Sequence, residues 1–122
     1  MISCIIVDDD YNITKVLSDI LELMGLEILA IGHDGKAVNL YEIHRPDILF
    51  TDIMMPKYDG FYGIEKIKEI DSNAKIVAIT ADVSSETQQR LYDLNISEII
   101  YKPFNQNEIK KVLTEKYRIN TK

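Results

Sequence analysis

Five short apolar runs alternate with segments of helical periodicity along this chain, and that alternation constrains the fold more than any other feature. Several runs are almost continuously apolar, which is typical of strands covered on both faces. A strict strand–helix alternation predicts an α/β fold with a parallel sheet, right-handed crossovers and helices on both faces. The five predicted strands are Ile2 to Val7, Leu26 to Ile31, Ile48 to Thr51, Lys75 to Thr80 and Glu98 to Tyr101.

The segments between the runs carry the spacing of amphipathic helices. Gly25 is placed to end the first helix, and the second, around 36–43, stops before Pro46. The fourth has the thinnest apolar stripe, so we expect it to be the least firmly held. The residues expected to face the core are Ile13, Val16, Leu17, Ile20, Leu21 and Met24 in the first helix; Ile64, Ile67 and Ile70 in a helix over 60–70; Leu91 and Leu94 in the fourth; and Ile109, Val112, Leu113 and Tyr117 in the last.

Two helix starts carry the spacing of a capping box, in which a short polar side chain precedes Glu or Gln by three residues. Ser85 with Gln88 predicts the start of the fourth helix, and Asn105 with Glu108 predicts the start of the fifth.

The composition bounds the domain organisation and the environment. With 122 residues, 46% of them hydrophobic, the chain is expected to form a single domain over 1–122, with 118–122 a tail or linker stub. A net charge of −6 argues against direct nucleic-acid binding. The lone Cys4 is expected to be a buried core residue, and no run approaches membrane-spanning length, so we expect a cytoplasmic protein that does not contact a membrane.

Four of the predicted strands end in polar groups suited to a phosphoryl group and a divalent cation. Asp8 and Asp9 follow the first strand and Asp52 the third, while Thr80 and Lys102 end the fourth and fifth. Ligands of such folds bind beyond the carboxyl ends of the strands. The fold and these residues therefore indicate the same edge of the sheet.

The three carboxylates would converge if the first and third strands are neighbours, and they would then need a cation, for which Mg²⁺ is the default. Asp10 is assigned instead to capping the first helix. A carboxylate beside Mg²⁺ can attack phosphorus and form an acyl phosphate. Lys102 would add positive charge and Thr80 a hydroxyl donor to the phosphoryl oxygens.

These residues resemble the receiver domain of two-component response regulators, and the resemblance runs from Met1 to about Tyr117. The motifs that carry it are Val7-Asp8-Asp9, Asp52-Ile53-Met54-Met55-Pro56 with Asp59-Gly60, Thr80-Ala81 and Lys102-Pro103-Phe104. The resemblance implies a flavodoxin-like, doubly wound sheet of order 2-1-3-4-5 and a Lys-Pro peptide bond that is usually cis.

The resemblance also implies roles for single residues. Asp52 would be the phosphoacceptor. Asp9, Asp52 and the backbone carbonyl of Met54 would bind Mg²⁺ directly, with Asp8 acting mainly through water. Thr80, Ala81 and Lys102 would bind the phosphoryl group.

By the same resemblance, the chain would take a phosphoryl group from a sensor histidine kinase or a histidine phosphotransfer protein. It would then switch the face formed by the fourth helix, fifth strand and fifth helix, and signal to a downstream protein or to an output domain outside this sequence. Homodimers could form through that face. The chain would catalyse only its own phosphorylation and dephosphorylation.

Two positions depart from the pattern that the resemblance implies. Three residues before Lys102, receivers usually carry an aromatic switch residue, and here that position is Ile99. Tyr101 lies on the same strand face, so we hypothesise that Tyr101 replaces the switch or that propagation is weaker. The positions that tune dephosphorylation hold Met54 and Asp82, from which we expect slow to moderate autodephosphorylation.

One alternative is an enzyme. Asp8 and Asp10 also satisfy the D-x-D pattern of haloacid-dehalogenase-like phosphatases, as nucleophile and acid/base, with Thr80 and Lys102 in matching order. That interpretation leaves Asp52 unexplained and finds no further acidic motif after Lys102. A flavodoxin-like cofactor carrier is excluded, because three carboxylates would repel the cofactor phosphate.

Overall fold

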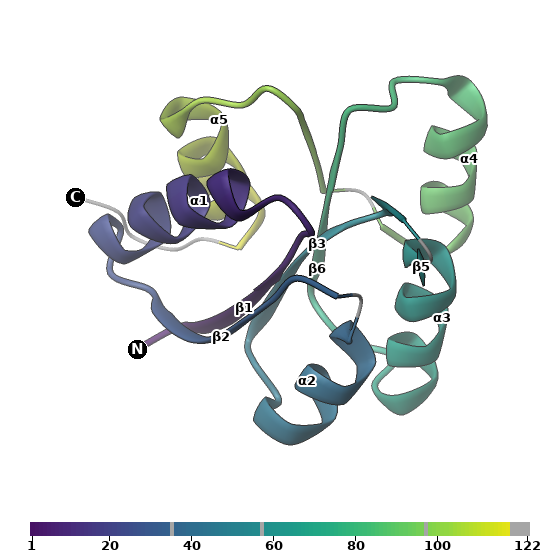
Figure 1. Ribbon diagram of the computed structural model, residues 1–122, viewed down its shortest axis with the longest axis horizontal. Coiled ribbons are helices and arrows are strands. Elements are labelled where there is room, and N and C mark those ends of the chain that lie inside the picture. The colour runs from purple at the N-terminus through teal and green to yellow at the C-terminus, as the bar shows by residue number, and fades with distance from the viewer. Residues whose placement is uncertain (35, 57, 97, 118–122) are drawn as a thin grey trace.

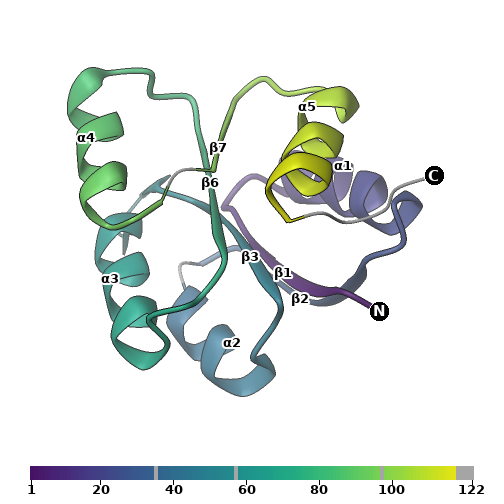
Figure 2. The same ribbon diagram turned by 180° about the vertical axis from the view of Figure 1, so that it is seen from behind.

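The computed structural model describes residues 1–34, 36–56, 58–96 and 98–117. Residues 118–122, predicted to be a tail or linker stub, lie outside the described residues. Within the described residues, a five-stranded sheet is covered by helices on both faces (Figures 1 and 2). Its strands are β1 (Ser3–Val7), β2 (Glu27–Gly32), β3 (Ile48–Asp52), β6 (Ile76–Thr80) and β7 (Ile99–Tyr101).

All neighbouring strands of this sheet are parallel, in the order β2-β1-β3-β6-β7. Counted over the five predicted strands, this is the order 2-1-3-4-5 of a doubly wound, flavodoxin-like fold, so the predicted fold class is confirmed. The strand ends differ from the predicted ones by at most one residue.

The helices form two layers (Figure 1). One layer is α1 (Tyr11–Leu23) with α5 (Gln106–Lys111), which continues as a π-helical turn over Val112–Lys116. The other layer is α2 (Ala37–His44), α3 (Gly60–Ile70) and α4 (Ser85–Asp93). In the part of the chain that the structure describes, no helix has both the length and the apolar character needed to cross a bilayer.

Alternate residues of each strand feed two separate cores. Ile5 and Leu49 pack in the core beneath α2, α3 and α4, whereas Cys4 and Phe50 pack in the core beneath α1 and α5. Cys4 is completely buried, as predicted. Because the inner strands β1, β3 and β6 are buried along nearly their whole length, their polar side chains can reach solvent only at the strand ends.

The first helix begins and ends as predicted, but its buried face is rotated. Asp10 caps α1 by accepting hydrogen bonds from the backbone N–H groups of Asn12 and Ile13, and Gly25 follows the helix with φ of 90°. The prediction that Val16 faces the core is wrong, since Val16 is 49% exposed. Two small polar residues take the buried face instead, because their hydroxyls are satisfied by backbone carbonyls: these are Thr14, bonded to Tyr11, and Ser18, bonded to Lys15.

The two predicted capping boxes have different outcomes. The Asn105 side chain accepts a hydrogen bond from the Glu108 N–H, so the start of α5 is confirmed. The predicted pairing of Ser85 with Gln88 is wrong. Ser84 is the cap of α4 and accepts from the Thr87 N–H, because Ser84 is the residue with extended backbone angles before the first turn.

A short feature after β3 was not predicted. Two short strands, β4 (Met54–Met55) and β5 (Tyr58–Asp59), pair antiparallel in the loop that leads to α3. Asp59 then caps α3 by accepting from the Phe61 N–H. A Cβ on Gly60 would meet the backbone of Ile53 and lie 3.0 Å from the Asp52 carbonyl oxygen, so only glycine fits where α3 passes the end of β3.

Candidate phosphoacceptor site

Three carboxylates meet at the carboxyl edge of the sheet. One oxygen from each of Asp8, Asp9 and Asp52 lies within 4.8 Å of the others. Because β1 and β3 are neighbours, with Val7 paired to Thr51, the residues at their ends are brought side by side. Asp8 and Asp52 are buried, while Asp9 is exposed. The cluster thus has a buried floor and one carboxylate facing solvent.

Lys102 places its ammonium between the two buried carboxylates. Its Nζ lies 2.8 Å from Oδ2 of Asp8 and 3.2 Å from Oδ2 of Asp52. The backbone N–H of Lys102 donates to the Thr80 carbonyl at 2.8 Å, which extends the pairing of β6 with β7 and sets where the side chain starts. The Lys102–Pro103 peptide bond is cis, as the resemblance implied.

Burial and charge act in opposite directions on this pair. Burial raises the pKa of Asp8, although the Lys102 ammonium opposes that shift. Burial works to lower the pKa of Lys102, but the adjacent carboxylates of Asp8 and Asp52 outweigh it and raise that pKa above its ordinary value. Lys102 is therefore charged at neutral pH, and among the described residues one ammonium faces three carboxylates.

Backbone N–H groups orient both buried carboxylates. The Met54 N–H donates to Oδ1 of Asp52 at 3.1 Å, and the Asp10 N–H donates to Oδ1 of Asp8 at 2.9 Å. In each case the Oδ2 atom is left for Lys102. Met54 thus has its backbone beside Asp52, while its side chain is 59% exposed.

Thr80 lies at the end of the next strand, since Asp52 pairs with Ile79. Its side chain is completely buried, and its Oγ1 accepts a hydrogen bond from the Asp82 N–H at 2.9 Å. Ala81 between them is exposed. The Asp82 carboxylate turns away from the cluster and accepts from the Ser84 N–H and from the Thr87 hydroxyl.

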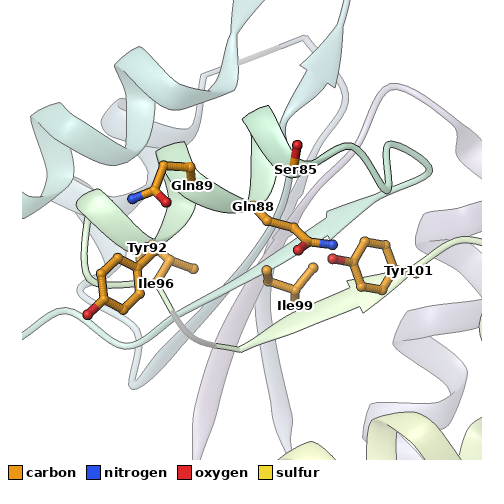
Figure 3. Close-up of a pocket in the computed structure, with 7 residues that line it drawn as sticks. All are labelled: Ser85, Gln88, Gln89, Tyr92, Ile96, Ile99 and Tyr101. Carbon is orange, nitrogen blue, oxygen red and sulfur yellow. The ribbon is translucent and has the colours of Figure 1, made fainter.

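Ile99 and Tyr101 share a strand face, as expected, and both line a groove between β7 and α4 (Figure 3). Each is half-buried. In Figure 3 the Tyr101 ring lies beside Ile99, with its hydroxyl on the side of Gln88. The groove is also lined by Tyr92 of α4.

Sequence reasoning missed two contacts around α4. Thr87 donates to Asp82, and Arg90 lies over the Phe61 ring at 3.8 Å from its centroid, which links α4 to α3. The spacing of Asp82, Ser84 and Thr87 is a recognisable helix-start pattern that could have indicated the first contact. No local signal indicates the second, because the two residues lie on different helices.

The phosphatase alternative is not supported. Asp10 is exposed and its carboxylate caps α1, so it is not available beside Asp8 as an acid/base. The charged side chains grouped with Asp8 are instead those of Asp9, Asp52 and Lys102, and Asp52 is the residue that the alternative left unexplained.

Comparison with solved structures identifies the same fold in chemotaxis proteins. The CheY chain in a CheX–CheY–BeF3–Mg complex from Borrelia burgdorferi superposes with a TM-score of 0.89 and 28% identity, over 95% of this chain and 89% of that one. CheY4 of Vibrio cholerae gives a TM-score of 0.86 and 25% identity, over 98% and 99% of the two chains.

Sequence comparison agrees. CheY of Bacillus subtilis is 30% identical over 112 residues, which is 91% of this chain and 93% of that protein. The response regulator GraR of Staphylococcus saprophyticus is 32% identical over 114 residues, which is 93% of this chain but only 50% of GraR. The chain therefore spans about half the length of one curated relative and nearly all of another.

The order of the strands, the acidic cluster at their carboxyl ends and these similarities agree with a match to the response regulator receiver domain over residues 4–114. The chain belongs to the receiver domains of two-component response regulators.

Proposed function

We propose that Asp52 accepts a phosphoryl group from a histidine of a sensor kinase or of a phosphotransfer protein, in a Mg²⁺-dependent reaction. One observation carries this proposal: three carboxylates lie within 4.8 Å of one another, and Lys102 bridges the two buried ones. Asp52 is the cluster member at the end of a central strand, held by the Met54 N–H and presented to Lys102.

The residues fit a divalent cation that prefers oxygen ligands. Oδ2 of Asp8 is buried without a well-aligned hydrogen-bond donor among the described residues, although the Lys102 ammonium is 2.8 Å away. Within the described part of the chain, three carboxylates facing one ammonium also leave negative charge uncompensated. Asp9, Asp52 and the Met54 carbonyl would hold Mg²⁺, with Asp8 acting through water. When bound, the ion would neutralise charge on the phosphoryl oxygens.

The phosphoryl group would be transferred by a displacement reaction at phosphorus. A carboxylate oxygen of Asp52 forms the new P–O bond as the P–N bond of the phosphohistidine breaks, and the electron pair stays on the imidazole nitrogen, which takes up a proton. Lys102 is positioned to shift from pairing with Asp52 to pairing with a phosphoryl oxygen. The Thr80 hydroxyl keeps its hydrogen free for another phosphoryl oxygen, because its present bond uses only a lone pair.

Hydrolysis of the acyl phosphate, that is, autodephosphorylation, would be slow to moderate. Met54 carries no group that orients water, and both Asp82 oxygens are engaged at the start of α4. A phosphoryl half-life of seconds would contradict this expectation.

Phosphorylation would change the surface formed by α4, β7 and α5, and the signal would pass to a downstream protein or to an output domain beyond this sequence. A structural relative supports contact with proteins, since the CheY of Borrelia burgdorferi was solved in a complex with CheX. We propose that the domain turns over no external substrate and binds no nucleic acid directly, and that homodimers could form through the same surface.

Intact mass measured after incubation with acetyl phosphate and Mg²⁺ tests the proposal. Wild type should gain one phosphoryl group, and Asp52→Ala should gain none. Asp10→Ala is a matched control that should still be modified, because Asp10 only caps α1. An adduct on Asp52→Ala, or one that forms without Mg²⁺, would show that the proposed site is wrong.

A further inference from the structure

A chain of hydrogen bonds connects the proposed phosphoryl site to α4. Its first link is the Asp82 N–H, which donates to Oγ1 of Thr80 at 2.9 Å. Thr80 is completely buried, so this hydroxyl has few alternative partners. Any movement of Oγ1 toward a phosphoryl group on Asp52 must either draw the Asp82 backbone along or break this bond.

The second link is the Asp82 carboxylate, which is fastened to the first turn of α4 at two points. Oδ1 accepts from the Ser84 N–H at 2.8 Å, and Oδ2 accepts from the Thr87 hydroxyl at 2.6 Å. Hydrogen bonds to a charged acceptor are shorter and stronger than neutral ones. The Thr87 hydroxyl and the Ser84 N–H also lower the pKa of Asp82, so the carboxylate is charged and its links persist at neutral pH.

The third link is Thr87 itself. Thr87 and Leu91 are one helical turn apart and are the two buried residues of α4. The rest of the helix is largely exposed, and it borders the groove that Tyr92 and Tyr101 line (Figure 3). Asp82 therefore accepts a hydrogen bond from one of the two buried side chains through which α4 packs against the rest of the domain.

We infer that Asp82 is a positioning residue that couples the packing position of α4 to the position of the Thr80 hydroxyl. When Thr80 engages a phosphoryl oxygen, the strain on the Asp82 N–H bond is passed through the carboxylate to Thr87, and the first turn of α4 shifts. This inference rests on the proposed function, because it names the route by which phosphorylation at Asp52 changes the α4 surface.

A simple helix cap would produce the same static contacts, so the test must measure coupling rather than stability. Beryllofluoride with Mg²⁺ serves as the phosphoryl mimic. Fluorine NMR of the bound mimic reports the site, and amide chemical shifts over Gln88 to Leu91 report α4. The variants are Thr87→Val, which removes the hydroxyl but keeps the side-chain shape, and Asp82→Ala; Asp82→Asn, which can still bond Ser84 and Thr87, is the rescue.

Ser84→Ala is the matched control, because it removes the cap to Thr87 without cutting the path from Thr80 through Asp82. We expect wild type and Ser84→Ala to show a full shift of the α4 amides on binding. Thr87→Val and Asp82→Ala should keep the fluorine signal of the bound mimic and lose most of that shift, and Asp82→Asn should regain it.

The outcomes separate the two proposals. A full α4 shift in both Thr87→Val and Asp82→Ala, or no α4 shift in wild type with the mimic bound, overturns the inference alone. If wild type binds no beryllofluoride and gains no phosphoryl group from acetyl phosphate, the proposed function fails and the inference fails with it.

Discussion

The ammonium of Lys102 lies 2.8 Å from Oδ2 of Asp8 and 3.2 Å from Oδ2 of Asp52, so one cation is shared by two buried carboxylates at the carboxyl ends of different strands. The side chains of Asp8 and Asp52 are no more than 3% exposed, and that of Lys102 is 19% exposed. This pairing therefore stabilises the site without a metal. A bound cation or phosphoryl group would change which oxygen atoms the Lys102 ammonium pairs with.

Lys102→Met should destabilise the protein when Mg²⁺ is absent. It leaves two buried carboxylates without a counter-ion, which costs about 3 kcal/mol in the free energy of unfolding. Saturating Mg²⁺ should restore part of the loss, because the ion would supply positive charge to the same cluster of carboxylates. Urea unfolding with EDTA and with Mg²⁺ measures both effects.

The matched control for this prediction is Lys15→Met. Lys15 pairs with Asp19 on the exposed side of α1, where solvent screens the two charges, so its loss should change the stability little. Equal losses of stability in the two variants would mean that the bridge between Asp8 and Asp52 is not a special contact.

Mg²⁺ should stabilise the wild type through Asp9. A ligand at about 100 times its dissociation constant adds about 2.7 kcal/mol to the free energy of unfolding. Asp9→Ala should remove this gain without disturbing the fold, because Asp9 is exposed. Asp10→Ala should lose about 1 kcal/mol from the lost helix cap and keep the gain. A gain that survives in Asp9→Ala but vanishes in Asp10→Ala would reverse the assignment of the two residues.

Gly60→Ala should be more harmful than Gly63→Ala, although both lie in α3. The new Cβ at position 60 would lie 2.8 Å from the Ile53 carbonyl oxygen, which is rigid backbone next to Asp52. We expect a loss of about 1–3 kcal/mol, together with weaker Mg²⁺ binding. At position 63 the new Cβ meets the end of the Tyr58 side chain, which can move aside. Calorimetric melting with and without Mg²⁺ would contradict this if Gly63→Ala were the more damaging change.

Cys4 should make the protein less stable as the pH rises above the pKa of an ordinary thiol. Burial raises the pKa of Cys4 to about 12 in the folded protein, whereas the thiol of the unfolded chain has a pKa of about 8.5. Between these values only the unfolded state releases the proton, so stability falls by about 1.4 kcal/mol per pH unit. Urea unfolding at pH 9 and pH 10 should show this slope.

Two measurements accompany the pH series. Cys4→Ala should lose the slope, and the native wild type should not react with a thiol reagent that labels the unfolded chain. Tyr41, whose pKa burial and the hydrogen bond to Asp71 also raise to about 12, contributes only above about pH 10. A rapidly labelled native thiol would contradict the assignment of Cys4 to the core.

Tyr101 is the remaining candidate for a switch side chain. It lines the groove beside α4 next to Ile99, at the position where a rotation would change that surface. Structures with and without beryllofluoride should show Tyr101 in two rotamers. One unchanged rotamer, with the mimic bound, would end the hypothesis that Tyr101 replaces the missing aromatic residue.

The amino-acid sequence is enough to assign the fold class and to name the polar residues of the candidate site. Burial on both faces makes a strand almost continuously apolar, and this signal is local, so the runs around Ile5 and Leu49 could be assigned directly. Parallel strands present their carboxyl ends at one edge, so the sequence alone is enough to group Asp8, Asp52, Thr80 and Lys102. The strand order came from the family resemblance, because periodicity does not encode which strands are neighbours.

The contacts among those groups, in contrast, follow only from how distant segments pack together. Lys102 and Asp52 are 50 residues apart, and their contact depends on the register of β3, β6 and β7. The burial of Thr14 in place of Val16, and the engagement of the Asp82 carboxylate by Thr87, depend on which competing hydrogen bonds and packing contacts are satisfied at once. Local patterns name the residues that can act, but packing between distant segments sets which of them meet.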